Sequence, residues 1–156
     1  MNGHLGVVRY LLQHRAAVDQ AKQNGTTPLF MAAQSGHLDV VRCLLEHHAA
    51  VDLAKQDGTT PLQAAAYDDH LDVLRHLVEQ GAAVNRAVNR GQTAAIFAAL
   101  KGHAAAIRAL AALGADMAVA APGGWTAVAL AASYGHLSAL RAMEKLGAGA
   151  DMQAAA

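Results

Sequence analysis

The feature that most constrains the fold of this chain is a motif that recurs every 33 residues. Glycine recurs at this step, and a threonine follows each glycine by two residues, giving the series Gly25, Gly58, Gly91, Gly124 and Thr27, Thr60, Thr93, Thr126. Histidine and arginine keep the same step, in the series His4, His37, His70, His103, His136 and Arg9, Arg42, Arg75, Arg108, Arg141. A single globular core does not require such a register, whereas a stack of similar units does. We therefore expect a repeat protein.

Each unit predicts a tight loop followed by two short helices. In the first full copy, the Asn-Gly pair at 24–25 is typical of a hairpin tip, because both residues tolerate positive φ. The Thr-Pro pair at 27–28 then opens a helix, since threonine caps it and proline suits the first helical position. The pattern predicts a first helix over 29–35, a turn at Gly36 and a second helix over 39–47.

These features together resemble the ankyrin repeat. The likeness is carried by the segments GTTPLFMAAQSGHLDVVRCLLEHHAAVD (25–52) and DGTTPLQAAAYDDHLDVLRHLVEQGAAVN (57–85), and it extends from Gly3 to about Asp151. The resemblance implies an all-α repeat solenoid, with ankyrin helix-turn-helix pairs joined by β-hairpin-like loops. It divides the chain into a half repeat 1–21, full repeats 22–54, 55–87, 88–120 and 121–151, and a short tail 152–156.

The sequence departs from the family pattern at several positions. Ankyrin repeats usually carry histidine after Thr-Pro-Leu, and the four copies here have Phe30, Gln63, Ile96 and Ala129 instead. We therefore expect the hydrogen bonds of that histidine to be absent. Asp69 also replaces the turn glycine of the second full copy.

The N-terminal half repeat has a second helix with no first helix before it. This helix presents Leu5, Val8, Leu11 and Leu12, and only some of these can pack onto the next repeat. We expect fraying near Met1, or self-association through this incomplete N-terminal repeat.

Composition and charge exclude several classes of function. Lys plus Arg and Asp plus Glu both number 12, so the net charge is zero and electrostatic capture of nucleic acid or of an anionic membrane is not expected. The longest uncharged run, 117–140, is broken by Pro122 and adjacent glycines, and no secretory signal precedes the repeats. Cys43 is the single cysteine, which fits a reducing compartment. We expect an intracellular, cytoplasmic protein.

Metal binding and catalysis find little support in the motifs. Histidines of neighbouring repeats stand about 10 Å apart, the spacing of packed helices, whereas metal ligands converge at about 2 Å from one ion. We expect these histidines to bond the backbone. Cys43 and His47, with His76 one repeat later, would be the alternative for zinc, but the same distance argues against it, and we expect these positions to lie on a convex surface that varies freely. The chain has no HExxH, CxxC, phosphate loop or nucleophile elbow. We expect no enzyme, metal site or cofactor.

The resemblance places the ligand groove on the loop tips and first helices. The groove positions carried over to this chain are Gln23, Asn24, Thr26, Gln34, Ser35, Gln56, Asp57, Thr59, Tyr67, Asp68, Asn89, Arg90, Gln92, Leu100, Lys101, Gly123, Trp125, Ser133 and Tyr134. Two interpretations remain: a scaffold that binds a partner protein in the groove, or a structural spacer or fragment without a partner of its own. Three aromatic side chains in the groove favour binding, and the alternative is that Trp125 packs against the next hairpin and Tyr67 against its own loop.

We select the candidate partner-binding residues by the charge and aromaticity of the groove positions in each copy. They are Gln34, Tyr67, Asp68, Arg90, Lys101, Trp125 and Tyr134. The third copy is basic there and the fourth is aromatic, and arginine and tryptophan often dominate binding energy. We expect the strongest site on Arg90, Lys101, Trp125 and Tyr134, and it would suit a partner segment that has an acidic residue beside an apolar one.

Overall fold

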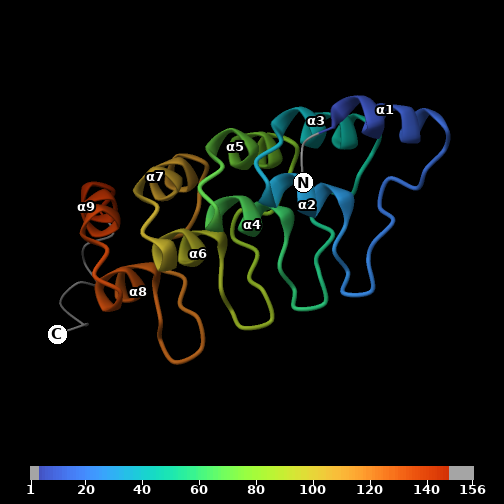
Figure 1. The fold of residues 1–156 in the computed structure, drawn as a ribbon. Coiled ribbons are helices and arrows are strands. Elements are labelled where there is room, and N and C mark those ends of the chain that lie inside the picture. The colour runs from blue at the N-terminus through green and yellow to red at the C-terminus, as the bar shows by residue number, and fades with distance from the viewer. Residues whose placement is uncertain (1–3, 148–156) are drawn as a thin grey trace.

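The computed structural model describes residues 4–147, and the chain forms a row of helix pairs (Figure 1). Within that span there are nine helices: α1 (Leu5–Gln13), α2 (Pro28–Gln34), α3 (Leu38–Glu46), α4 (Pro61–Tyr67), α5 (Leu71–Glu79), α6 (Ala94–Lys101), α7 (Ala104–Ala112), α8 (Ala127–Ser133) and α9 (Leu137–Lys145). The same span contains no strand, and an isolated bridge joins Ala121 to Trp125.

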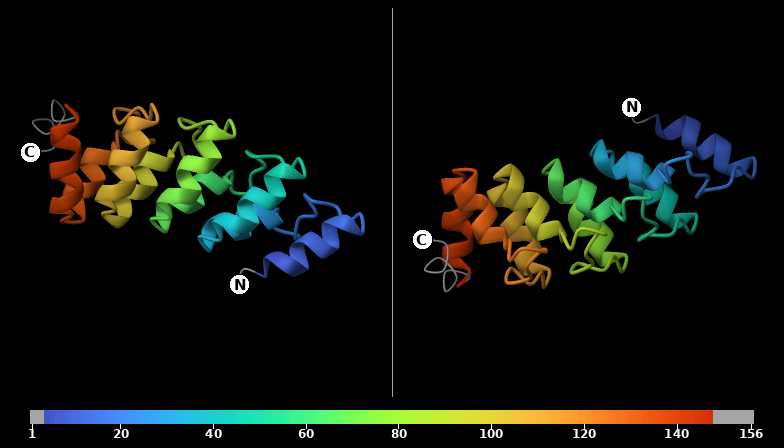
Figure 2. Two further views of the ribbon diagram at one scale, coloured as in Figure 1. Left: turned by 90° about the horizontal axis from the view of Figure 1, so that it is seen from above. Right: turned by 90° about the horizontal axis from the view of Figure 1, so that it is seen from below.

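The helices lie in two layers. One layer contains α2, α4, α6 and α8, and the other contains α1, α3, α5, α7 and α9, so that each helix packs on its counterpart in the next repeat. The loops project from the first layer to one side of the molecule (Figure 1), and the order along the row follows the chain when seen from above or below (Figure 2). The expected all-α repeat solenoid is confirmed.

The first helix of each full repeat begins at a threonine cap. The hydroxyl oxygens of four threonines accept a hydrogen bond from the backbone N–H three residues on, and these threonines are Thr27, Thr60, Thr93 and Thr126. The first helix starts one residue earlier than predicted, at Pro28, because proline needs no hydrogen-bonding N–H in the first turn. The second helix of that copy also starts one residue early, at Leu38, since the carbonyl of His37 accepts a bond from the Val41 N–H.

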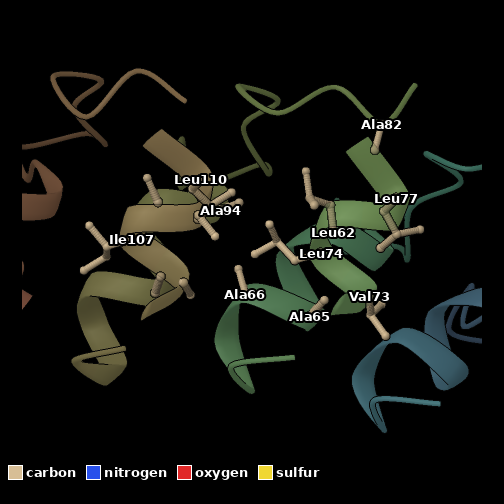
Figure 3. Close-up of a cluster of buried hydrophobic side chains, with 14 of the residues drawn as sticks. Leu62, Ala65, Ala66, Val73, Leu74, Leu77, Ala82, Ala94, Ile107 and Leu110 are labelled. Atoms are coloured by element: carbon tan, nitrogen blue, oxygen red, sulfur yellow. The ribbon is translucent and has the colours of Figure 1, made fainter. Parts of the chain in front are cut away.

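The core runs between the two layers (Figure 3). Leu62 of α4 meets Leu74 and Leu77 of α5 in one cluster, and Ile107 and Leu110 of α7 extend the cluster into the next repeat. All five side chains are at most 1 % exposed. Burying a leucine or isoleucine side chain contributes about 1.5–3 kcal/mol, so stacking, not any single unit, supplies the stability.

The repeating histidine joins each repeat to the one before it. His70 Nε2 lies 3.0 Å from the carbonyl oxygen of Gln34, and His103 and His136 make the same bond to Tyr67 and Leu100. A carbonyl oxygen can only accept, so Nε2 carries the proton and donates. The prediction that these histidines bond the backbone is confirmed. A Cβ on Gly36 would lie 2.6 Å from the His70 ring, which explains the glycine at this turn.

A second series of bonds joins the loops that follow the second helices. The carboxylate of Asp19 accepts from the Ala50 N–H, that of Asp52 accepts from the Ala83 N–H, and Asn85 Oδ1 accepts from the Asp116 N–H. The donor is 31 residues after the acceptor in every case. The residue that continues the series is Ala118, which has no side-chain acceptor.

Two sequence-based expectations are corrected by the structure. Gln63, at the position of the family's histidine, is 1 % exposed, and its Nε2 donates to the carbonyl of Arg86 at 2.6 Å. The expected loss of hydrogen bonds at this position is therefore wrong for the second full copy. Cys43, assigned to a freely variable convex surface, is 2 % exposed, because it faces the helix layers.

Candidate partner-binding groove

Each of the four loops that precede the first helices is closed by the same backbone hydrogen bond across its base, with a second bond from the tip glycine inside it. The closing bonds run from Lys22 N to Thr26 O, Lys55 N to Thr59 O, Val88 N to Gln92 O and Ala121 N to Trp125 O. At the first tip only Gly25 has a positive φ, and Asn24 instead accepts a bond from the Thr26 N–H through its side chain. Of the two residues of the Asn-Gly pair, only the glycine uses the positive φ that both tolerate. The tips are hairpin-like turns without strands.

The tips of the first three loops are tied together in series. Gln56 Nε2 donates to the carbonyl of Gln23 at 2.7 Å, and Asn89 Nδ2 donates to the carbonyl of Gln56 at 3.3 Å. The next residue in this series is Pro122, which has neither a side-chain donor nor a backbone N–H. The fourth loop is therefore the one that lacks this tie.

A cleft of about 720 Å³ lies where that tie is missing. It is formed by the third and fourth loops and by α8, and its lining residues are Asn89, Arg90, Gln92, Ala121, Pro122, Trp125, Leu130, Ser133 and Tyr134. The cleft offers apolar surface, several hydrogen-bonding groups and one permanently charged group, the guanidinium of Arg90. We call this site the fourth-loop cleft.

The large side chains of the fourth-loop cleft are open to solvent. The exposed fractions of Trp125 and Tyr134 are 46 % and 60 %. Tyr134 stacks on His136 at a ring separation of 6.2 Å, which supports its exposed ring. Aromatic rings of this size contribute much of the binding energy when a partner covers them.

A second aromatic cluster lies next to the cleft along the row of first helices. The ammonium group of Lys101 stands 4.8 Å from the centre of the Tyr67 ring, and Phe97 meets the same ring edge-on at 6.0 Å. Lys55 stands 5.2 Å above the ring of Phe30 in the same manner one repeat earlier. These cation–π contacts hold each lysine side chain over an aromatic ring.

Hydrogen bonds at the second tip shift the titration of one carboxylate. The side chain and the backbone N–H of Thr59 hydrogen-bond to the Asp57 carboxylate, and the ammonium group of Lys55 lies close to it. These groups together lower the pKa of Asp57 below its ordinary 3.8. This carboxylate stays charged at neutral pH.

Comparison with known families decides the nature of the chain. A family model of ankyrin repeats, spanning three copies, matches residues 1–87 and 84–155, which is nearly the whole chain. The chain belongs to the ankyrin-repeat family. Ankyrin repeats are in general protein–protein interaction modules, and their family is typically one of non-enzymatic scaffolds. A separate comparison with curated proteins gives no match.

The ankyrin solenoid brings only part of the predicted site together. Arg90, Trp125 and Tyr134 line the fourth-loop cleft, whereas Lys101 lies over Tyr67 in the neighbouring cluster. Gln34 and Asp68 are exposed at the ends of their helices, outside the cleft lining.

Sequence reasoning missed several groove residues. Phe97 and Leu130 were not singled out, yet each lies four residues before a predicted site residue, Lys101 and Tyr134. A spacing of four puts two side chains on one face of a helix, so this signal was available. Pro122 was missed because its effect depends on the repeat before it.

The histidines of the Cys43 and His47 alternative for zinc contact local groups through their ring nitrogens. His47 Nδ1 lies 2.8 Å from the carbonyl oxygen of Cys43, and His76 Nδ1 lies 3.6 Å from the carboxylate of Glu79. Over residues 4–147 no three histidine, cysteine or acidic side chains gather closely enough to hold a metal ion. In the same span, no helix combines the length and apolar character that crossing a bilayer requires.

Proposed function

We propose that this ankyrin-repeat chain recognises a partner protein through its groove face, the surface formed by the four loops and by α2, α4, α6 and α8. The observation that carries this proposal is the fourth-loop cleft, where Trp125 and Tyr134 stand largely exposed around a hollow of about 720 Å³. An exposed tryptophan beside an arginine that has no ion-pair partner within residues 4–147 is the composition of a binding hot spot. Tyr67, Lys101 and Phe97 extend the same surface.

The competing interpretation is a structural spacer or a fragment whose partner binds elsewhere. A spacer has no need of large exposed aromatic rings, because these cost solubility and contribute nothing to stacking. The Trp125 ring does touch the turn beside it, since a Cβ on Gly123 would lie 3.4 Å from its Cδ1 atom. Trp125 as a whole residue is still 46 % exposed, and this exposure favours recognition over the spacer.

The test is affinity capture with wild-type and variant protein side by side, with bound proteins quantified by mass spectrometry. Trp125→Ala removes the largest ring of the groove and keeps the backbone bond from the Ala121 N–H to residue 125. We expect the partner to lose about 2 kcal/mol or more of binding free energy, some thirtyfold in affinity. The free energy is then measured by calorimetry with the purified partner.

Arg42→Ala and Arg108→Ala are the matched controls. Both arginines are exposed on the second-layer helices α3 and α7, away from the groove face, and neither substitution should weaken binding. Equal binding of the partner by the Trp125 variant and by both controls would favour the spacer or a different surface.

A second candidate, self-association, has an observation of its own at α1. Val7, Tyr10 and Leu11 are 57 %, 60 % and 50 % exposed. One repeat later the corresponding residues are all buried, at 6 % for Val40, 2 % for Cys43 and 2 % for Leu44. Of the four residues predicted to face the gap, Leu5, Val8 and Leu12 pack partly on the core and Leu11 stays open.

Self-association through α1 is testable by sedimentation equilibrium. If it occurs, the wild-type chain shows a concentration-dependent rise in mass, and Leu11→Gln abolishes that rise. A wild-type chain that remains a monomer throughout would remove this candidate without touching the groove proposal.

A further inference from the structure

We propose that the fourth-loop cleft binds an extended segment of the partner in which an aspartate or glutamate stands next to a large apolar residue. This inference rests on the proposed function, groove-face recognition, and names the chemistry of the partner. It follows from what distinguishes this junction from the two junctions before it.

The junctions differ in how the carbonyl groups at the loop tips are used. The carbonyls of Gln23 and Gln56 each accept a hydrogen bond from the amide side chain of the next loop. The corresponding carbonyl of Asn89 accepts none from the described part of the chain, since Pro122 stands where the donor would be. An unused backbone acceptor therefore lies at the junction of the third and fourth loops, whose residues line the cleft.

An extended peptide is the occupant that fits an unused acceptor of this kind. A strand-like segment presents backbone N–H groups along its edge, and one of them can donate to Asn89 as the side chains of Gln56 and Asn89 do at the earlier tips. A helix cannot, because its N–H groups are bonded internally beyond the first turn.

The charge of the cleft selects an acidic residue. Arg90 is exposed, and its guanidinium makes no ion pair or hydrogen bond within residues 4–147. The cleft lining contains no carboxylate. A guanidinium presents paired N–H donors that match the two oxygens of a carboxylate, so an aspartate or glutamate is the natural complement.

The floor of the cleft selects an apolar neighbour. Leu130 and Pro122 line it together with the ring of Trp125, and these groups leave apolar surface beside the guanidinium. A large apolar side chain would cover that surface and exclude water from the adjacent ion pair, which strengthens it.

The test uses a library of random peptides displayed on phage, selected against the intact chain. We expect enrichment of peptides with aspartate or glutamate adjacent to leucine, isoleucine, methionine or an aromatic residue. For the best synthetic peptide, Arg90→Gln should weaken binding on the order of tenfold or more. Replacing the peptide's acid by its amide should have the same effect on wild type and almost none on Arg90→Gln.

Pro122→Gln tests the backbone bond separately. The new amide can donate to Asn89 as Gln56 does to Gln23, so peptide affinity should fall severalfold although Arg90 and Trp125 remain in place. Arg108→Gln is the matched control, and thermal unfolding of each variant verifies that the fold is kept.

Two results would overturn the inference. One is failure to enrich any peptide, and the other is enrichment of peptides that lack the acidic residue or that bind Arg90→Gln as well as wild type. If such peptides still lose affinity with Trp125→Ala, groove-face recognition stands and only the partner chemistry is wrong. If Trp125→Ala also binds them fully, both proposals fail together.

Discussion

Three residues other than glycine adopt a left-handed backbone conformation, and each marks a turn where the repeat pattern favours glycine. They are Arg15, His48 and Asp69, with φ values of 63°, 65° and 59° among the described residues. At the position of Asp69, the other full copies have Gly36, Gly102 and Gly135. Asp69 carries a second cost, because its Oδ1 atom is buried and has no hydrogen-bond partner within residues 4–147.

Asp69→Gly should stabilise the protein by about 1 kcal/mol. The substitution relieves the side-chain cost of the left-handed conformation and the unsatisfied oxygen, and the greater freedom of glycine in the unfolded chain offsets part of this gain. Urea denaturation followed by circular dichroism measures the change. Asp68→Gly, at the exposed preceding residue, is the comparison and should not stabilise; a loss of stability for Asp69→Gly would contradict the account.

Asp57 should make stability depend on pH in the acid range. Its folded-state pKa lies below the ordinary 3.8 because of the hydrogen bonds from Thr59 and the charge of Lys55. A lowered pKa stabilises the fold above the ordinary value, and this contribution is lost as the pH falls through the folded-state pKa. Wild type should therefore be more stable than Asp57→Asn at neutral pH, by a small margin since the side chain is 59 % exposed.

The stability difference between wild type and Asp57→Asn should shrink as the pH falls below 3.8 and vanish below the lowered folded-state pKa of Asp57. Parallel denaturation curves across that range measure it. A difference that stays constant down to the lowest pH would mean that Asp57 does not carry the effect.

At the scale of elements, α1 differs from every other helix of the row. None of its residues is buried, and among the described residues α3 is the one helix that packs closely on it, whereas α3 and α5 bury three or more residues each. A nine-residue helix is marginal without tertiary packing. Leu5, Val8 and Leu12 supply the packing that α1 has.

The amides of α1 should exchange with solvent faster than those of α3 and α5. Helix opening exposes little apolar surface here, so its free energy is far below that of global unfolding. Native-state hydrogen exchange resolved by residue measures the difference. Equal protection of α1 and α5 would contradict this, unless the sedimentation experiment shows α1 covered by a second copy.

At the scale of the whole molecule, the two ends of the stack differ in the side chains that pack the repeats together. From Thr93 onward 25 of 64 residues are alanine, against 14 of 92 before it. Each methylene absent from the interior removes about 0.8 kcal/mol of transfer free energy. The alanines of α7 also leave a hollow of about 380 Å³ against α5, and the two polar series between repeats stop at Ala118 of the third full copy and at Pro122 of the fourth.

We therefore expect the C-terminal end to open first in denaturant. Repeat arrays need not unfold as one unit, because each repeat contacts only its neighbours. The prediction covers Ala94–Ala156, of which 148–156 lie outside the described residues. Hydrogen exchange at low denaturant should show α8 and α9 opening before α4 and α5; the slowest amides lying in the last two repeats would contradict it.

The sequence by itself determined the repeat, the caps and the direction of the stack. Period, threonine caps and turn glycines act within one unit, so they can be recognised from a few neighbouring residues. The same local reasoning placed Trp125, Tyr134 and Arg90 on one face, and the structure puts them around one cleft.

Only the tertiary structure decided what depends on two repeats at once. Three features of this kind join residues 23 to 34 positions apart. Lys101 lies over the ring of Tyr67, Gln63 donates to the carbonyl of Arg86, and Pro122 leaves the Asn89 carbonyl unused. Such contacts depend on how one unit is rotated and translated on the next, and this is set by the packing of buried side chains across the interface. The cleft is a property of a junction, and no single repeat contains it.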